Sequence, residues 1–226
     1  MKLLCFDLDG TLFDTRQDIA DAVNRARLEF ELPELSVPQV TSMVGHGISA
    51  LARKAFQDSD VDPSLARKLI LDYYQRHPAD KATLYPGVRE TIPILKYVLT
   101  VVSNKRKVLV DALLEKHGLT QYFDFVSGGD TFKEKKPDPG AIDFLLERFH
   151  AAPAEVLVIG DHSPDIEMAK RSSVRSVFCR YGFFGKDEVG ADFQIDSFPE
   201  LLTILENIAE RASQTDQYGK RSTIDD

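Results

Sequence analysis

Two carboxylates, Asp7 and Asp9, stand two residues apart near the start of the chain, in the segment DLDGT at 7–11. The run 2–8 is otherwise apolar, as expected of a parallel strand that is buried on both faces. Side chains two residues apart on an extended chain point to the same side. Because a lone carboxylate is costly to bury, Asp7 needs a charged partner or a cation nearby. The pair predicts a chemical site at the carboxyl end of the first strand.

Two other interpretations of this segment, a calcium-binding loop and a solvated turn, explain it less well. Placing Gly10 at the obligatory glycine of a calcium loop puts Cys5 at the first ligand position and Arg16 where a bidentate Glu belongs. Neither side chain serves there. A solvated turn does not explain why Asp7 interrupts an apolar strand. We therefore interpret the segment as part of a functional site.

Further polar residues stand where other predicted strands end or where a helix begins: Ser103, Asn104, Lys136, Asp161 and Asp165. In an open parallel sheet the carboxyl ends of the strands share one edge, and ligands bind there. A hydroxyl, an ammonium and a helix N-terminus are groups that bind phosphate. Carboxylates gathered beside them repel one another unless a hard cation such as Mg²⁺ lies between them. These residues predict a site for a phosphate group and Mg²⁺.

The elements that must position these residues alternate between strand and helix. Strands are predicted at 2–8, 97–103, 155–160 and 174–179, with weaker patterns at 123–127 and 192–195. Helices with one apolar face are predicted at 105–117, which stops before Gly118, and at 138–150, with Pro139 in the first turn. This alternation predicts an α/β fold, a doubly wound, Rossmann-like parallel sheet with helices on both faces.

One long stretch breaks the alternation. Residues 8–97 contain no strand pattern, and the stretch is too long for a single crossover. A helix is predicted to open at Thr15, with Asp18 three residues on as in a capping box, and two more helices are predicted at 48–56 and 64–74. We interpret the chain as a discontinuous core with an inserted helical cap and a polar tail that is expected to fray. The core is 1–14 with 81–212, the cap is 15–80 and the tail is 213–226.

Composition excludes several classes of protein. The 226 residues carry 36 acidic and 28 basic side chains, a net charge of -8, whereas a duplex-binding surface has a basic excess, so nucleic acid is not an expected partner. No run approaches the roughly 18 apolar residues of a membrane span, and Asp7 comes too early for a secretory signal. Cys5 and Cys179 lie in apolar runs, so reduced thiols and a cytoplasmic location are expected. No oligomeric state is inferred.

Four short motifs, in the order DLDGT, VVSN, KKP and GDHSPD, resemble those of the haloacid dehalogenase-like phosphatase superfamily. The resemblance extends from Lys2 to about residue 185. Within that superfamily, four further segments look like those of phosphoglycolate phosphatases: 44–56, 84–88, 127–130 and 180–185. The resemblance implies a Mg²⁺-dependent phosphoric monoester hydrolase acting on a small-molecule phosphate ester, and 2-phosphoglycolate is the substrate it favours.

The resemblance also implies roles for the acidic residues. Asp7 would be the nucleophile that attacks phosphorus and forms an aspartyl-phosphate. Asp9 would be the general acid for the leaving oxygen and then the general base for the hydrolytic water. Mg²⁺ would bind a carboxylate oxygen of Asp7 and the backbone carbonyl of Asp9. Asp161 would be a further ligand, with Asp165 binding directly or through water.

The phosphate-binding residues that the resemblance implies are Gly10, Thr11, Ser103, Asn104 and Lys136. Ser103 and Lys136 would hold the phosphoryl oxygens. Backbone N–H groups near Gly10 and Asn104 would add to them, and Thr11 would orient the carboxylates. Stabilising the charge of the transferring group is the main demand of this chemistry.

His162 departs from the family pattern, which has Ser or Thr directly after the aspartate of GD. It would either approach the substrate or cap the next helix, and we favour the second interpretation. In the cap, substrate specificity is expected from Gly45, His46 and Gly47, with Arg53 binding a substrate carboxylate. A solvated helix face is the other interpretation of Arg53.

Other functions stay open at this point. On the same scaffold they are an inorganic pyrophosphatase, a nucleotidase and a phosphosugar mutase. A non-catalytic binding protein is a different class, and it has no need of both aspartates. The pattern G-x-G-x-x-A at 45–50 also occurs in dinucleotide-binding folds, where it follows a strand. Here it lies among predicted helices, so we interpret it as a turn that opens a cap helix.

Overall fold

The computed structural model describes residues 1–185 and 190–221, with side chains described as far as residue 211. In this part of the chain six parallel strands form one sheet in the order β5-β4-β1-β6-β7-β8. Their bounds are β1 (Leu3–Phe6), β4 (Val98–Val102), β5 (Phe125–Ser127), β6 (Val156–Gly160), β7 (Arg175–Cys179) and β8 (Phe193–Ile195). The doubly wound parallel sheet is therefore present, and the two weaker strand predictions are confirmed as its edge strands β5 and β8.

Strand β1 lies at the centre of the sheet because it pairs with β4 on one side and β6 on the other. Its side chains alternate between two apolar clusters, as the period of two in a strand requires. Leu4 and Phe6 belong to one cluster, and Leu3 and Cys5 to the other, all at most 1% exposed. Burial on both faces explains why this strand is apolar without alternation.

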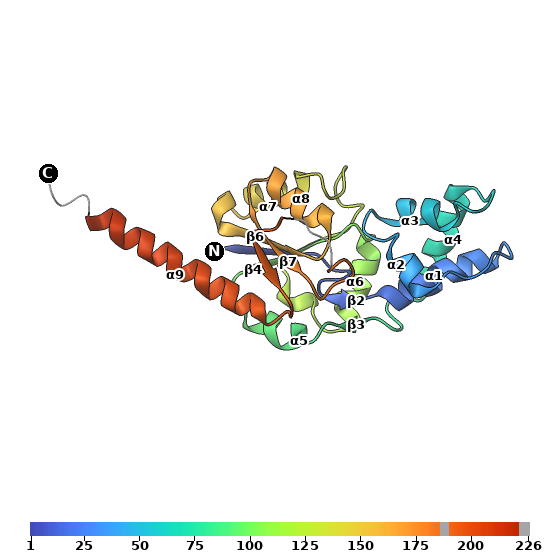
Figure 1. The fold of residues 1–226 in the computed structure, drawn as a ribbon, viewed down its shortest axis with the longest axis horizontal. Helices are drawn as coiled ribbons and strands as arrows, with labels where there is room; N and C mark the ends of the chain where they lie inside the picture. Colours follow the sequence, from blue (N-terminus) through green and yellow to red (C-terminus); the bar gives the residue numbers. More distant parts are fainter. Residues whose placement is uncertain (186–189, 222–226) are drawn as a thin grey trace.

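Helices cover both faces of the sheet (Figure 1). The cluster that contains Leu4 also holds side chains of α5 (Val88–Thr91), α6 (Lys107–Lys116) and α9 (Glu200–Arg221). The cluster that contains Leu3 holds side chains of α7 (Gly140–Arg148) and α8 (Ser163–Arg171). Short 3-10 turns complete the connections: η1 (Ile92–Ile94), η2 (Thr120–Tyr122) and η3 (Pro153–Glu155).

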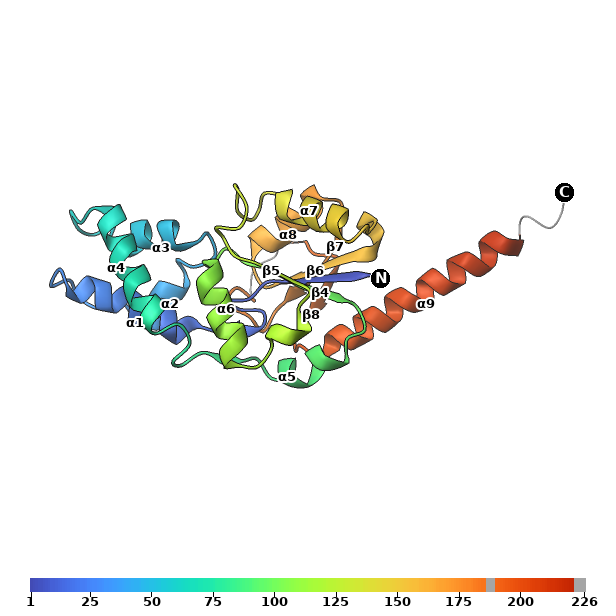
Figure 2. The same ribbon diagram turned by 180° about the vertical axis from the view of Figure 1, so that it is seen from behind.

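The segment 15–80, which we call the cap segment, forms a separate group of helices at one end of the molecule (Figures 1 and 2). These are α1 (Arg16–Leu28), α2 (Val37–Thr41), α3 (Ile48–Ala55) and α4 (Pro63–Arg76). They enclose an apolar cluster that includes Val23, Val40 and Ile70, each fully buried. The amphipathic patterns of the sequence are explained by this second cluster, since each helix buries one face in it.

Two short strands, which the sequence did not predict, lie where the chain enters and leaves the cap segment. Strand β2 (Phe13–Asp14) pairs antiparallel with β3 (Thr83–Leu84). Two residues are too few to show a period in the sequence. The pair ties the two connections of the cap segment to each other.

The capping box predicted at Thr15 and Asp18 is wrong. No side-chain bond caps α1; the Thr15 hydroxyl instead donates to Asp9 Oδ1 at 2.6 Å. The Asp18 carboxylate accepts hydrogen bonds from the backbone N–H groups of Lys81 and Ala82, at 2.9 and 2.8 Å. Both side chains therefore join segments that are distant in the sequence, and such tertiary bonds override a local capping preference.

Helix α9 runs to Arg221, so the backbone is helical through 213–221, where a frayed tail was expected. The rest of that expected tail, 222–226, lies outside the described residues. Both ribbon views show α9 extending away from the sheet, at the opposite end from the cap segment (Figures 1 and 2). Apolar periodicity reports a buried helix face, so its absence did not exclude a helix here. None of the helices described is long and apolar enough to cross a membrane.

Candidate active site

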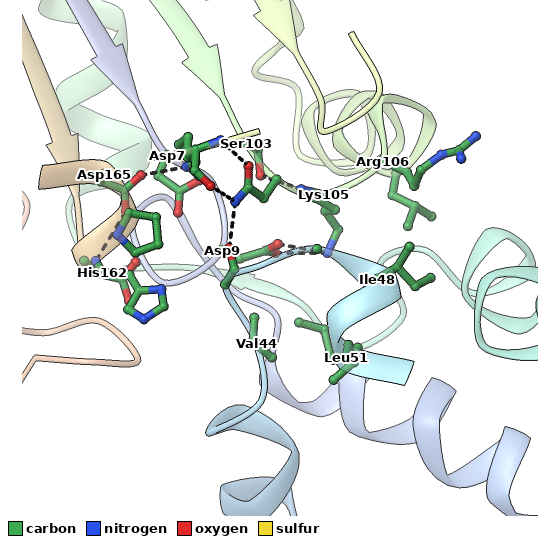
Figure 3. A pocket seen from close by; sticks show the side chains of 18 of the residues that line it. Asp7, Asp9, Val44, Ile48, Leu51, Ser103, Lys105, Arg106, His162 and Asp165 are labelled. Atoms are coloured by element: carbon green, nitrogen blue, oxygen red, sulfur yellow. Dashed lines mark hydrogen bonds and ion pairs between the residues drawn. The ribbon is translucent and has the colours of Figure 1, made fainter. Parts of the chain in front are cut away.

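The residues singled out in the sequence meet at the carboxyl edge of the sheet. Asp7 follows β1, Ser103 follows β4 and Asp161 follows β6, and these three strands are neighbours. Figure 3 shows Asp7, Ser103 and Asp165 gathered at the ends of the strands. The edge therefore brings together residues that are more than 150 positions apart, such as Asp7 and Asp161.

Three carboxylates form the centre of the site. Asp7, Asp161 and Asp165 each offer an oxygen, and these oxygens lie within 4.8 Å of one another. Asp161 and Asp165 are at most 2% exposed, and Asp7 is 9% exposed. Carboxylate oxygens are the ligands that hard divalent cations prefer. The donor set therefore fits a cation such as Mg²⁺.

Lys136 lies among these carboxylates. Its ammonium donates to Asp7 Oδ1 and Asp165 Oδ1, both at 2.6 Å, and to the carbonyl of Val102 at 2.8 Å. The side chain of Asn104 holds the backbone of Lys136 in place: its Oδ1 accepts from Lys136 N–H at 3.0 Å and its Nδ2 donates to the Lys136 carbonyl at 3.1 Å. One ammonium thus partly compensates three buried negative groups.

The pKa values of Asp7 and Asp161 show that negative charge is unfavourable in this cluster unless positive charge lies nearby. Burial raises the pKa of Asp7 to about 7; Lys136 opposes this rise and Asp165 adds to it. Burial, followed by the charges of Asp7 and Asp165, raises the pKa of Asp161 well above its usual range. Protons therefore compete with cations for these oxygens near neutral pH.

Asp9 has different surroundings from Asp7. Its carboxylate is outside the three-carboxylate cluster, and its Oδ1 accepts from Thr15 Oγ1 at 2.6 Å and from Lys105 Nζ at 3.0 Å. Figure 3 shows this carboxylate directed toward Lys105. Two carboxylates with different environments are suited to two different chemical roles.

The loop after β1 fits closely against Asp161. Gly10 has a φ of +92°, and a Cβ at this position would collide with the Asp161 carboxylate. Thr11 Oγ1 donates to Asp161 Oδ1 at 3.3 Å, and the N–H of Phe183 donates to Asp161 Oδ2 at 2.7 Å. The orienting contact of Thr11 is therefore with Asp161.

Ser103 is 4% exposed, and its Oγ accepts a hydrogen bond from the N–H of Lys105 at 3.2 Å. It shares the lining of one cavity with Asp7, Asp9 and Lys136. Most of the core residues with predicted chemical roles line this cavity; Gly10 and Thr11 do not, but both lie against Asp161.

The cap segment forms the other side of the cavity. Its lining residues there are mostly apolar: Ile19, Val44, Gly45, Gly47, Ile48, Leu51 and Tyr74. Figure 3 shows Val44, Ile48 and Leu51 on this side. Asn104 Nδ2 donates to the Gly45 carbonyl at 2.8 Å, a direct bond between core and cap segment.

Of the specificity residues expected in the cap segment, two line the cavity and two do not. Gly45 and Gly47 line the cavity. The exposed ring of His46 packs edge-on against the ring of His162, with centroids 5.6 Å apart. Arg53 is exposed and is not among the residues that line the cavity. This position agrees with the second interpretation of Arg53, as part of a solvated helix face.

His162 occupies the position before the first residue of α8, and its backbone N–H donates to Asp165 Oδ2 at 3.3 Å. Its ring stacks on Phe184, with centroids 3.8 Å apart and an interplanar angle of 17°. Both residues line the cavity. His162 thus begins the helix through its backbone while its ring borders the site.

Two residues of the site were missed in the sequence. Lys105 was interpreted only as the start of a helix, and Tyr74 only as part of the cap. Lys105 contacts Asp9, and its Nζ also lies 2.5 Å from the Tyr74 hydroxyl. The position of Lys105 directly after Ser103 and Asn104 was a usable signal for it. No local signal pointed to Tyr74, because its partner is on another part of the fold.

The fold and the site geometry agree with the sequence relationships. A family model described as haloacid dehalogenase-like hydrolase matches residues 4–179. The chain belongs to this family. The match extends from β1 to β7 and includes the entire cap segment.

Alignments with individual relatives extend over most of the chain, further than the family match does. A phosphoglycolate phosphatase of Vibrio vulnificus is 36% identical over 219 residues, which is 91% of this chain and 96% of the relative. A phosphoglycolate phosphatase of Aquifex aeolicus is 33% identical over 210 residues, covering 92% and 98%. The crystal structure of a predicted phosphoglycolate phosphatase from Haemophilus somnus has a TM-score of 0.87 at 29% identity, covering 91% and 98%.

Proposed function

We propose that this hydrolase is a Mg²⁺-dependent phosphatase of small phosphate monoesters and that 2-phosphoglycolate is its substrate. The observation that carries the proposal is the grouping of Asp7 with Lys136 and two further carboxylates in a cavity between core and cap segment. The choice of substrate is supported by the phosphoglycolate phosphatases that are 32–36% identical to the chain over most of its length.

The three clustered carboxylates, Asp7, Asp161 and Asp165, would hold Mg²⁺ together with the backbone carbonyl of Asp9. When bound, the ion would neutralise charge on the carboxylates and on the phosphoryl oxygens. Lys136 and Ser103 would bind the phosphoryl oxygens, with backbone N–H groups near Gly10 and Asn104. These groups stabilise the charge of the transferring phosphoryl group, which is the largest demand of the reaction.

The reaction would proceed in two displacements at phosphorus. A carboxylate oxygen of Asp7 attacks in line, the bond to the ester oxygen breaks, and Asp9 donates its proton to that oxygen as glycolate leaves. Asp9, now a carboxylate, takes a proton from water, and the water oxygen attacks the phosphorylated Asp7. Phosphate leaves, and the Asp7 carboxylate and the protonated Asp9 are restored.

We also propose a division of labour within the chain: 1–14 with 81–212 as catalytic core and 15–80 as a cap that excludes water and selects the ester. Contacts of the cap segment with both core and cavity support this division. Buried and unpaired Cys5 and Cys179 support a cytoplasmic location.

The test is release of phosphate from 2-phosphoglycolate, pyrophosphate, nucleoside monophosphates and sugar phosphates, each with and without Mg²⁺. We expect Mg²⁺-dependent release with a clear preference for 2-phosphoglycolate. Asp7→Asn should fold normally and lose at least about 1,000-fold of turnover, since an amide cannot replace the nucleophile.

The other outcomes separate the remaining candidates. Activity spread evenly over the esters would keep the mechanism and remove 2-phosphoglycolate as the substrate. A preference for pyrophosphate, a nucleotide or a sugar phosphate would assign the site to that class. Substantial turnover by Asp7→Asn would refute the nucleophile assignment.

A further inference from the structure

Lys105 is a buried cation whose partners are a general acid and a residue of the cap segment. Its side chain is 4% exposed. The ammonium donates to both carboxylate oxygens of Asp9, at 3.0 and 3.3 Å, and to the hydroxyl of Tyr74 at 2.5 Å. The same nitrogen lies 4.4 Å from the centre of the Tyr74 ring. An ammonium has three donors, and these contacts occupy them.

Lys105 carries its charge in this place. Burial lowers the pKa of its ammonium, but Asp9 and Tyr74 raise the pKa further than burial lowers it. Burial raises the pKa of the Tyr74 phenol, so the hydroxyl stays neutral. Removing one partner of a buried ion pair leaves the other charge without compensation. The three side chains therefore depend on one another.

The three residues come from three separate parts of the fold. Asp9 follows β1, Lys105 lies between β4 and α6, and Tyr74 is near the end of α4 in the cap segment. Tyr74 is 4% exposed although it lines the cavity, because α4 packs against α6 there. A movement of α4 away from the core would separate the Tyr74 hydroxyl from Lys105.

We propose that Lys105 and Tyr74 are positioning residues that couple the seating of the cap segment to the orientation of the Asp9 carboxyl group. Lys105 contacts Asp9 directly, and Tyr74 acts through Lys105. This inference rests on the proposed function, in which the proton of Asp9 passes to the ester oxygen as the phosphorus–oxygen bond breaks. Lys105 then pairs with the carboxylate that this transfer leaves on Asp9.

The nature of the leaving group makes the proposal testable. An alkyl ester such as 2-phosphoglycolate would release an alkoxide, so it needs the proton of Asp9. Acetyl phosphate is similar in size but releases acetate, which leaves without protonation. A defect confined to Asp9 orientation therefore slows the alkyl ester much more than the acyl phosphate, whereas a general loss of structure or of phosphate binding slows both.

The experiment compares kcat/KM for the two substrates in Lys105→Met, Tyr74→Phe and the double variant. The value of kcat/KM depends on the steps up to departure of the leaving oxygen, and it does not depend on the later hydrolysis of phosphorylated Asp7. Asp9→Asn sets the scale for complete loss of the general acid. Lys107→Met is the matched control, since Lys107 is two residues on and pairs with Asp111 on the partly exposed face of α6.

For Lys105→Met we expect kcat/KM for 2-phosphoglycolate to fall about 10- to 100-fold, within the range that general acid catalysis contributes. Acetyl phosphate should lose less than about threefold. Tyr74→Phe, which removes only one oxygen atom, should show the same selectivity with a smaller loss. The double variant should be no slower than Lys105→Met, because Tyr74 acts through Lys105. Lys107→Met should match the parent on both substrates.

Two results would overturn the inference while leaving the proposed function standing. One is an equal loss on both substrates in Lys105→Met when Asp9→Asn is selective. The other is a Tyr74→Phe variant that matches the parent, which would remove the cap segment from the coupling. If Asp9→Asn itself lacks selectivity, the general-acid role in the proposed function fails, and this inference fails with it. If Lys105→Met does not fold, the kcat/KM values of Tyr74→Phe for the two substrates still test the inference, because Lys105 is unchanged in that variant.

Discussion

At the scale of single residues, two aspartates with the same local spacing acquire different chemistry from their neighbours. Asp7 faces Lys136 and two further carboxylates, whereas Asp9 faces Thr15 and Lys105. A nucleophile must be ionised and unhindered, while an acid must be able to release a proton. The two carboxyl groups therefore have different partners, which is the condition for two carboxyl groups to take different roles.

Lys136 is expected to stabilise the folded protein most when no divalent cation is present. Lys136→Met removes the ammonium that pairs with Asp7 and Asp165. We expect the free energy of unfolding at neutral pH to fall by about 3–5 kcal/mol in a chelating buffer, as for loss of one partner of a buried pair. Added Mg²⁺ should recover part of this loss by supplying positive charge to the carboxylates. Urea unfolding with and without Mg²⁺ measures both effects.

Lys135→Met is the control for this prediction, because Lys135 is the adjacent residue and its side chain is only half-buried beside Gly47. Its unfolding free energy should change by less than about 1 kcal/mol, as for a surface substitution. Equal losses in the two variants, or no recovery with Mg²⁺, would contradict the role of Lys136 as the compensating charge.

The raised pKa of Asp7 predicts how stability depends on pH in the metal-free protein. A carboxyl group with a higher pKa in the folded protein than in the unfolded chain binds more protons when folded. Burial raises the pKa of Asp7 from 3.8 to about 7. Its contribution to the free energy of unfolding is therefore full below about pH 4 and is lost as the pH rises toward 7. The loss should be about 2–4 kcal/mol.

Urea unfolding in a chelating buffer at several pH values between 4 and 8 measures this slope. Asp7→Asn should have a shallower slope, since an amide does not titrate. Saturating Mg²⁺ should also flatten the slope in the parent, because a bound cation keeps the carboxylates ionised. The assignment to Asp7 is wrong if the parent and Asp7→Asn have the same slope.

At the scale of elements, the connections to the cap segment are held by Asp18. This residue of α1 accepts the N–H groups of Lys81 and Ala82 on the returning chain and is 4% exposed. The bonds join the first helix of the cap segment to the approach of β3, next to the β2–β3 pair. Asp18 therefore joins the start of the cap segment to the chain that leaves it, beside the β2–β3 pair.

Asp18→Ala should leave those two N–H groups without their acceptor. We expect the free energy of unfolding to fall by about 1–3 kcal/mol and the amides of Lys81 and Ala82 to exchange faster with deuterium. Asp21→Ala is the matched control, because Asp21 lies one helical turn away and pairs with the side chain of Lys81 at the surface. Surface pairs contribute at most about 1 kcal/mol. Unchanged exchange in Asp18→Ala would show that the returning chain is held by other contacts.

At the scale of the whole molecule, core and cap segment meet closely at Gly45. Its φ is +109°, its carbonyl accepts from Asn104, and a Cβ at this position would collide with the ring of His162. His162 cannot move aside freely, because it is stacked on Phe184. Closure of the cavity in this arrangement requires a residue without a side chain at position 45.

Gly45→Ala should therefore hold the cap segment away from the core. We expect kcat/KM for 2-phosphoglycolate to fall about 10- to 100-fold, the scale that follows from displacements of about 1 Å in an active site. The radius of gyration from small-angle scattering should rise. Gly118→Ala is the control, since Gly118 also has a positive φ, +67°, but nothing lies within 4 Å of an added Cβ. It should lose about 1–2 kcal/mol of stability from strain and keep its kcat/KM.

Much of this architecture was determined by the sequence alone. The apolar runs predicted the four central strands of the sheet, because residues buried on both faces leave a continuous local pattern. The edge strands β5 and β8 are only partly buried, and their patterns were weaker. The strand ends then placed Asp7, Ser103 and Asp161 at one edge, since parallel strands finish on the same side. These inferences needed only short windows of sequence and the general rules of parallel sheets.

The tertiary structure decided what each side chain binds. Thr15 and Asp18 matched a capping box but join distant segments, and Lys105 was missed because its partners, Asp9 and Tyr74, lie 96 and 31 residues away. Periodicity and capping preferences describe neighbours within about one or two helical turns. Which groups meet across the cavity depends instead on how the cap helices pack against the sheet, and that packing is a property of the whole chain.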